Sequence, residues 1–189
     1  RYSPAGKFIM QDSNQGGHDP YHVNKLGWSK PQIYASSDYE LGDKITLNLK
    51  DFQSSGQNII LTNKWNSANS LYDEYMILEL FSPKGLNEYD SKVTYLNLVN
   101  SGIRLWHVNS MLTDIHDSEN KTSEIIDGRS YYIANSNNDV DSEFDLLHMI
   151  RSNQNEPYNT TSMLHQSNVL FEEGDSFDMD FYQSQFLKG

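Results

Sequence analysis

The segment "EYMILELFSP", residues 74–83, decides the fold class of this chain, because it is an apolar run of strand length that follows a polar loop. More segments with the features of strands lie on both sides of it, and turn residues separate them. They are "KITLNLKDF" (44–52), "QNIILTN" (57–63), "SGIRLWHVNS" (101–110), "RSYYIANS" (129–136), "FDLLHMI" (144–150), "NVLFEEGDSFDM" (168–179) and "YQSQF" (182–186). This spacing predicts a mainly β fold, an antiparallel β-sandwich.

Two of these segments carry more specific predictions. In residues 44–52, the apolar side chains of Ile45, Leu47 and Leu49 alternate with polar neighbours, which predicts a half-buried strand. Residues 144–150 fit a short helix as well as a strand, because their aliphatic side chains would share one face of a helix.

The composition of the 189 residues limits the classes of function. The chain has no cysteine, which excludes disulfides, thiolate zinc sites and a cysteine nucleophile. Its net charge of −12 repels nucleic acid and anionic membranes, and its many Asp and Asn side chains favour hard cations such as calcium. No apolar run approaches the ~20 residues that a membrane span needs. We therefore expect no nucleic-acid partner and no membrane span.

Residues 1–31 are rich in turn signals and contain one predicted helix. Asp19 suits the N-cap of this helix, and Pro20 suits its first position. The helix then runs to Leu26, and Gly27 ends it.

Two histidines beside this helix raise the question of a metal site. His18 and His22 are four residues apart, so on one helix they would share a face and could bind a metal together. A helix that starts at Pro20, however, leaves His18 outside it. The residues alone therefore allow either a structured loop with a helical turn or part of a metal site.

The stretch "FIMQDSNQGGHDPYHVNKLGW" (8–28) resembles the end of the catalytic domain in immune-inhibitor-A-type secreted zinc metallopeptidases, with their I-M-x-x turn and D-P-Y-S-K-x-x-L-G-W run. The resemblance continues, in the same order, through "KPQIY" (30–34), "DEYMILELFSPKGLNEYDS" (73–91), "SGIRLWHVNSML" (101–112) and "LFEEGDSFDM" (170–179). It implies that residues 1–30 are the tail of an α/β catalytic domain, with a methionine turn and a short helix. Residues 31–189 would then form a β-sandwich domain.

The resemblance also implies a zinc site in the full-length parent. In the family, an H-E-x-x-H helix holds the zinc, and its Glu is the general base for a zinc-bound water. Met10 matches the methionine of the turn beneath the metal, and Met10 and Trp28 are expected to be structural. Asp19 or His18 is the possible third zinc ligand of the parent.

The sequence departs from the family at the motif that carries the chemistry. No H-E-x-x-H is present, because none of the six histidines is followed by Glu. These histidines are His18, His22, His107, His116, His148 and His165. We therefore expect a C-terminal fragment of a secreted or cell-surface peptidase, with no catalytic residue of its own and no peptide hydrolysis when isolated. Its expected partners are the upstream catalytic domain and a peptide or protein substrate.

Loss of the upstream half would expose apolar surface around Phe8, Ile9 and Met10, so self-association or disorder is expected there. The alternative function is that of a binding protein rather than of part of an enzyme. In this hypothesis, the chain is a non-catalytic β-sandwich module that binds carbohydrate or a surface protein.

A possible calcium site lies in "NSNNDVDSEFD" (135–145). Asn135, Asn137, Asp139 and Asp141 occupy alternate positions, and oxygen ligands with this spacing can surround a calcium ion. A solvated acidic loop is the other interpretation.

Three side chains on the predicted strands, and one turn, complete the predictions. His107 is expected to be buried and hydrogen-bonded. Glu74 and Glu79 are expected to face solvent or to pair locally. Gly174 is expected at positive φ in a turn.

Overall fold

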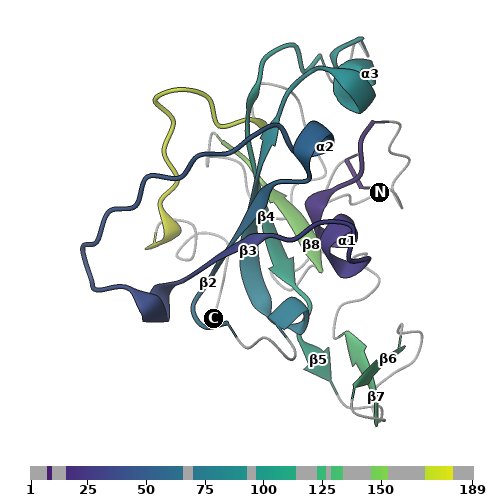
Figure 1. The fold of residues 1–189 in the computed structure, drawn as a ribbon, viewed down its shortest axis with the longest axis vertical. Helices are drawn as coiled ribbons and strands as arrows, with labels where there is room; N and C mark the ends of the chain where they lie inside the picture. The colour runs from purple at the N-terminus through teal and green to yellow at the C-terminus, as the bar shows by residue number, and fades with distance from the viewer. Residues whose placement is uncertain are drawn as a thin grey trace.

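The computed structural model describes residues 8–9, 16–65, 70–92, 97–113, 123–126, 129–133, 146–152 and 169–180. This part of the chain is mainly β, as predicted, and its centre is a five-stranded sheet with the strand order β1-β2-β3-β4-β8 (Figure 1). The five strands are β1 (Gln32–Ala35), β2 (Asn58–Thr62), β3 (Glu74–Phe81), β4 (Gly102–Asn109) and β8 (Leu147–Ile150).

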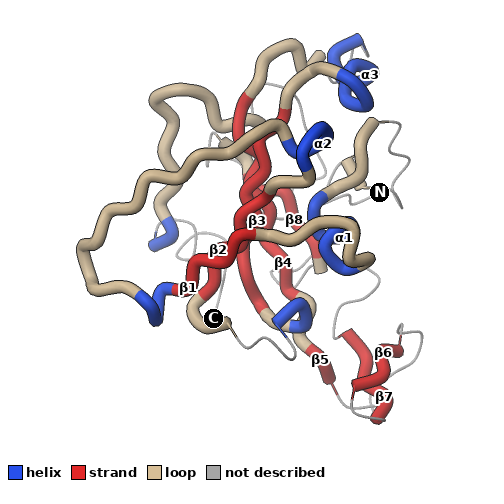
Figure 2. Tube along the Cα trace, viewed as in Figure 1, coloured by secondary structure: helices blue, strands red, loops and turns tan. Residues whose placement is uncertain are grey.

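A smaller sheet with the order β5-β7-β6 lies beyond the end of β4 (Figure 1). Its strands are β5 (Leu112–Thr113), β6 (Ser123–Ile126) and β7 (Arg129–Ile133). The helices are short: α1 (Pro20–Lys25), α2 (Phe52–Ser55) and α3 (Glu88–Lys92), with 3-10 turns η2 (Ser36–Asp38), η3 (Ser70–Tyr72) and η4 (Gly85–Asn87). In Figure 2, the three α-helices lie on one side of the large sheet, and the long loop after β1 passes on the other. None of the helices in the described ranges is long and apolar enough to cross a membrane.

The central strands form where the sequence predicts them, but the sheet is mixed rather than antiparallel. β3 and β4 pair antiparallel along their whole length, from Glu74↔Asn109 to Phe81↔Gly102. β1 and β2, in contrast, pair parallel, so the prediction of a purely antiparallel arrangement is wrong at this edge. The reason is the long connection between β1 and β2, since only a long crossover brings a chain back in the same direction.

The predicted strand at residues 44–52 is also wrong. Residues 44–50 belong to no strand, and the side chain of Ile45 is 46% exposed. Alternation favours an extended backbone, but a strand also needs a neighbour with which to form hydrogen bonds. The end of the segment instead starts α2, whose N-cap Asp51 accepts a hydrogen bond from the backbone N–H of Ser54.

The segment that was open between strand and helix forms β8, antiparallel to β4. The predicted helix in the opening stretch is confirmed as α1. The carboxylate of Asp19 accepts a hydrogen bond from the backbone N–H of His22 at 3.0 Å, and Gly27 follows at φ 72°. His18 therefore lies outside the helix, as expected. The turn at Gly174 is confirmed as well, with φ 92°.

Successive side chains of each strand point to opposite faces of the large sheet, and different parts of the chain cover the two faces. We call the first the helix face; its side chains include Ile60, Ile77 and Trp106, and the opening stretch packs on it. We call the second the cavity face; it carries Met76 and Leu105.

The opening stretch belongs to the core of the helix face. Phe8 is 1% exposed and Ile9 is 8% exposed, and both pack in one cluster with Tyr21, Ile77 and Trp106. The expectation that Phe8 and Ile9 form an exposed apolar edge is therefore wrong, because the strands themselves provide a surface that covers them.

Candidate functional site

The possible zinc ligand Asp19 is buried and paired with the histidine one helical turn away. Both oxygens of Asp19 lie close to Nδ1 of His22, at 2.9 and 2.8 Å. The side chain of Asp19 has no exposed surface, whereas that of His22 is 19% exposed. Nε2 is consequently the nitrogen of His22 that is directed away from Asp19. A carboxylate that holds one nitrogen of an imidazole is common behind metal-bound histidines.

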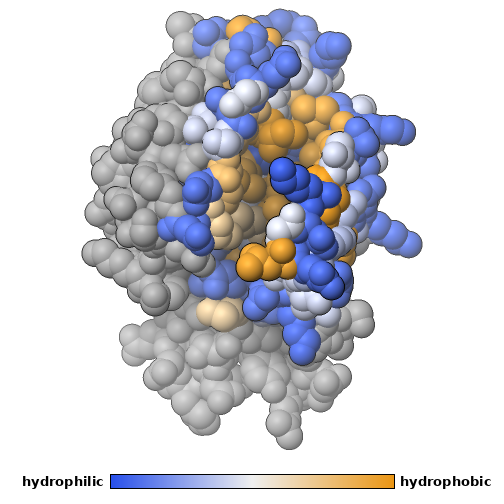
Figure 3. All heavy atoms as spheres, turned by 90° about the vertical axis from the view of Figure 1, so that its left-hand side faces the viewer, coloured by the Kyte–Doolittle hydropathy of each residue, from blue (hydrophilic) through white to orange (hydrophobic). Residues whose placement is uncertain are grey.

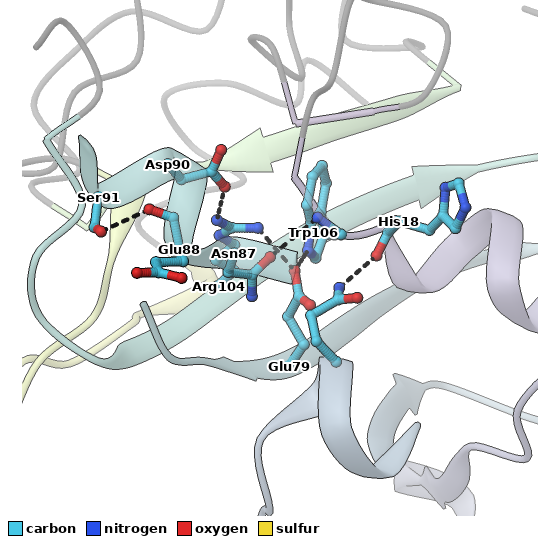
Figure 4. Close-up of polar contacts among 10 residues, drawn as sticks. His18, Glu79, Asn87, Glu88, Asp90, Ser91, Arg104 and Trp106 are labelled. Carbon is cyan, nitrogen blue, oxygen red and sulfur yellow. Dashed lines mark hydrogen bonds and ion pairs between the residues drawn. The ribbon is translucent and has the colours of Figure 1, made fainter. Parts of the chain in front are cut away.

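His18, the other possible ligand, is held through its backbone. Its carbonyl oxygen accepts a hydrogen bond from Nε2 of Gln53 at 2.8 Å, and its ring lies 6.0 Å from that of Trp28. Trp28, expected to be structural, is 66% exposed. In Figure 4, the imidazole of His18 points away from the charged groups on the sheet.

The charged groups in Figure 4 form a cluster that the sequence analysis did not predict. We call it the Arg104 cluster; it comprises Glu79, Asp90, Arg104 and Trp106. Nη1 of Arg104 lies 3.7 Å from Glu79, and Nη2 lies 3.4 Å from Asp90. The indole N–H of Trp106 donates to Glu79 at 2.9 Å. The three charged side chains are each 4% exposed or less, so this cluster is enclosed within the protein.

Glu79 was expected to face solvent or to pair locally. It does pair, with a residue directly opposite on β4, but it is 1% exposed. A signal for this was present in the sequence, because a period of two places Glu79 on the same face as Tyr75, Ile77 and Phe81. Arg104 is likewise in phase with Trp106 on β4.

Burial changes the protonation of the cluster. It raises the pKa of Glu79 to about 7, although the charge of Arg104 and the hydrogen bond from Trp106 oppose the increase. Burial also raises the pKa of Asp90, again against the effect of Arg104. Glu79 can therefore gain or lose a proton near neutral pH. Because the cluster is enclosed, a change in its protonation affects the stability of the fold rather than a bound substrate.

The opening stretch is fixed on this cluster by close contacts. The guanidinium of Arg104 lies over the ring of Phe8 at 4.5 Å, where a cation is attracted to the π-electrons. The backbone N–H of Gly17 donates to Oδ1 of Asn87 at 3.2 Å. A Cβ on Gly16 would lie 2.9 Å from Oδ2 of Asp90, and one on Gly17 would overlap the amide of Gln53. Both glycines therefore permit a close approach that a side chain would prevent.

The cavity face carries a second acid–base pair, and it differs in access to solvent. Nε2 of His107 lies 2.8 Å from Oε1 of Glu74, and the two side chains are 2% and 45% exposed. His107 is thus buried and hydrogen-bonded, as predicted. The hydrogen bond from His107 lowers the pKa of Glu74 despite partial burial. His148 lies opposite His107 on β8, and burial, together with the charge of His107, lowers its pKa well below the usual value.

The structure thus brings Asp19 and His22 together, but the ring of His18 does not join them in a metal-binding group. Within the described ranges, no three His, Asp or Glu side chains lie close enough together to bind a metal ion. Met10 and the possible calcium ligands lie outside the described residues; these ligands are Asn135, Asn137, Asp139 and Asp141.

Comparisons with known proteins give no relative on which to base a function. No protein-family model, no curated protein and no solved structure matches this chain.

Proposed function

We propose that this chain is the C-terminal part of a secreted zinc metallopeptidase of the immune-inhibitor-A type, inactive in peptide hydrolysis when isolated. In this proposal, residues 1–30 end the catalytic domain, and residues 31–189 form a β-sandwich that supports them. The observation that supports it best is the buried carboxylate of Asp19, which lies 2.8 Å from Nδ1 of His22 at the position that the resemblance gives to a zinc ligand. In this proposal the sheet, and not the upstream domain, covers Phe8 and Ile9.

The residues of the opening stretch fit part of a zinc site. A catalytic zinc takes three protein ligands and a water, and an H-E-x-x-H helix of the parent would supply two of these ligands. Asp19 or His18 would supply the third. Asp19 is already bound by His22, which would orient its carboxylate, whereas His18 would offer an imidazole next to Trp28. The zinc would activate a water for attack on the peptide carbonyl.

The proposal is tested by comparing the 189-residue chain with the same chain preceded by its in-frame upstream sequence. Metal content after dialysis is measured by plasma mass spectrometry, and hydrolysis is measured with a quenched fluorescent peptide. We expect neither stoichiometric zinc nor hydrolysis for the shorter chain, and both for the longer one. Stoichiometric zinc in the shorter chain, or an upstream sequence without H-E-x-x-H, would contradict the proposal.

Substitutions in the longer protein identify the third ligand. If Asp19 binds the zinc, Asp19→Asn should lower zinc content and activity together, while His18→Gln leaves both unchanged. If His18 binds it, the two results are exchanged. Asp38→Asn, on the exposed turn η2, is the matched control. The same metal measurement reports calcium, which we propose for the loop that contains Asp139 and Asp141.

One observation favours a binding module as a second candidate function. The rings of Tyr34 and Tyr39 stack, with centroids 6.5 Å apart and planes inclined by 21°. They line a hollow of about 560 Å³, and aromatic faces at a surface are suited to sugar rings. A glycan array should then give binding that Tyr39→Ala removes and Tyr89→Ala, at an exposed tyrosine of α3, does not. Equal binding by the two variants would exclude this hollow as the sugar site.

A further inference from the structure

The cavity face contains a hollow that the peptidase proposal does not use. Its volume is about 660 Å³, which is within the range of small-molecule sites. Its apolar lining comes from four strands or loops that are distant in sequence, so the fold itself forms it. The apolar lining residues are Leu61, Met76, Leu78, Leu105, Phe177 and Met179. Figure 3 views the molecule from this side and shows apolar side chains gathered between polar ones.

One acid–base pair lines the same cavity. Glu74 and His107 both contribute to its wall, and their side chains are hydrogen-bonded at 2.8 Å. The side chain of Glu74 is 45% exposed, and the hydrogen bond from His107 keeps its pKa below the usual value. Glu74 is therefore a carboxylate at neutral pH, and one that His107 holds in a fixed position beside the apolar wall.

The surroundings add negative charge. The cavity shares Ser36, Leu61 and Thr62 with the hollow beside it, and that hollow is lined by Glu40 and Asp43. Among the residues that the structure describes, neither lining contains a Lys or Arg side chain. Three acidic side chains around the two adjoining hollows favour a cation over an anion as the ligand. Among the apolar molecules that fit the cavity, the acidic side chains therefore favour those with a positive charge.

We propose that this cavity binds a small amphiphilic cation. Its apolar body lies between Leu78, Leu105 and Phe177, and its amine or guanidinium group pairs with Glu74. Each part of this ligand corresponds to a part of the wall. The apolar walls gain from the removal of water, and the carboxylate gains a charge-assisted hydrogen bond. The proposal does not depend on the peptidase assignment.

The test uses three probes of similar size and different charge: 4-phenylbutylamine, 4-phenylbutan-1-ol and 4-phenylbutyrate. They are titrated into the 189-residue chain labelled with ¹³C at the methionine methyl groups. Methyl signals report the site, because Met76 and Met179 line the cavity, whereas Met149 is buried on the helix face. The titrations of the three probes are made in one buffer at one pH, so that only the charge of the probe changes.

We expect the amine to shift the signals of Met76 and Met179 but not that of Met149. Its affinity should exceed that of the carboxylate by at least about tenfold, with the alcohol between them. Glu74→Gln should reduce the affinity for the amine to about that of the alcohol. The matched control is Glu88→Gln, an equally conservative change at an exposed acid of α3, and it should leave the affinity unchanged.

Three results would overturn the proposal. They are the absence of shifts at Met76 and Met179, equal affinity for amine and carboxylate, and an affinity for the amine that Glu74→Gln leaves unchanged. The comparison of the amine with the carboxylate needs no variant, so it decides the question even if Glu74→Gln fails to fold.

Discussion

The two faces of the large sheet each carry a glutamate beside a basic side chain, in different surroundings. On each face, a glutamate of β3 lies within 4 Å of a basic side chain of β4: Glu79 with Arg104 on the helix face, and Glu74 with His107 on the cavity face. Both residues of the first pair are buried, whereas Glu74 of the second is 45% exposed. The two glutamates therefore differ in burial: Glu79 is enclosed with its partner, whereas Glu74 is accessible to a ligand.

The pKa values of the two glutamates differ accordingly. Burial raises the pKa of Glu79 to about 7, because the loss of water outweighs the attraction to Arg104. The pKa of Glu74 is lowered, because its hydrogen bond with His107 outweighs a smaller loss of water. The comparison leads to four predictions, in order of decreasing effect.

The largest effect is expected when the cation of the buried pair is removed. Arg104→Met keeps much of the side-chain volume but leaves Glu79 and Asp90 buried without a counter-ion. We expect the free energy of unfolding to fall by about 3 kcal/mol, which is typical of a broken buried ion pair. The measurement is urea denaturation at pH 7, followed by tryptophan fluorescence.

A second substitution serves as the control for this prediction. If unpaired charge is the cause, Glu79→Leu added to Arg104→Met should restore part of the stability, because one of the stranded carboxylates is then gone. A loss below about 1 kcal/mol for Arg104→Met alone would mean that the cluster does not hold the opening stretch on the sheet.

The next effect is a pH dependence that originates on the helix face. Between its unfolded pKa of 4.5 and its folded pKa of about 7, Glu79 binds a proton in the native state but not in the unfolded state. Stability from this group is therefore fully present below pH 4.5 and is lost as the pH rises to about 7. Glu79→Gln stays neutral, so the chain with Glu79 should lose stability relative to it across this range, by about 3 kcal/mol at most.

On the cavity face, His148 changes the stability with pH in the opposite direction. The comparison of the chain with Glu79→Gln removes this contribution. The pKa of His148 is lowered by burial, so His148 destabilises the fold as the pH falls below 6.5, where the unfolded chain binds the proton. Both proteins contain His148, and the effect cancels when their free energies of unfolding are subtracted. A difference that stays constant between pH 4.5 and pH 7 would contradict the buried, neutral Glu79.

The elements that local chemistry determines could be predicted from the sequence. Helix α1 follows from Asp19 at its N-cap and Gly27 after its end, and β3 and β4 follow from runs of apolar residues. Pairing could not be predicted in this way. Residues 44–50 have the alternation of a strand but no strand beside them, and the parallel neighbour of β1 depends on the path of a long connection.

The features of the two faces also differ in whether local sequence predicts them. A buried histidine at position 107 follows from its apolar neighbours along β4. The Arg104 cluster, in contrast, joins β3, β4 and α3, and only the folded chain brings these elements together. The cavity likewise depends on Phe177 reaching a sheet whose strands precede it by many residues.

A moderate effect is expected where the opening stretch contacts the sheet. Gly17→Ala places a methyl group on the side chain of Gln53, which must then move and lose its hydrogen bond to the carbonyl of His18. We expect a loss of about 1–2 kcal/mol in the free energy of unfolding. Gln53→Ala removes the overlap, so Gly17→Ala should cost less in that background. Equal costs in the two backgrounds would show that Gln53 does not restrict Gly17.

The smallest effect is expected from Glu74, and it distinguishes the two faces most directly. In Glu74→Gln the charge is lost, but an amide oxygen remains that can accept the hydrogen bond from Nε2 of His107. Because the side chain is half exposed, its ion pair is screened by water, and the free energy of unfolding should fall by less than about 1 kcal/mol. Glu74→Ala also removes the acceptor, so the buried Nε2 of His107 loses this hydrogen bond. This variant should therefore lower the free energy of unfolding more, by about 1–2 kcal/mol. If Glu74→Gln were as damaging as Arg104→Met, the charge itself would stabilise the cavity face, and the distinction between a pair for folding and a pair for binding would fail.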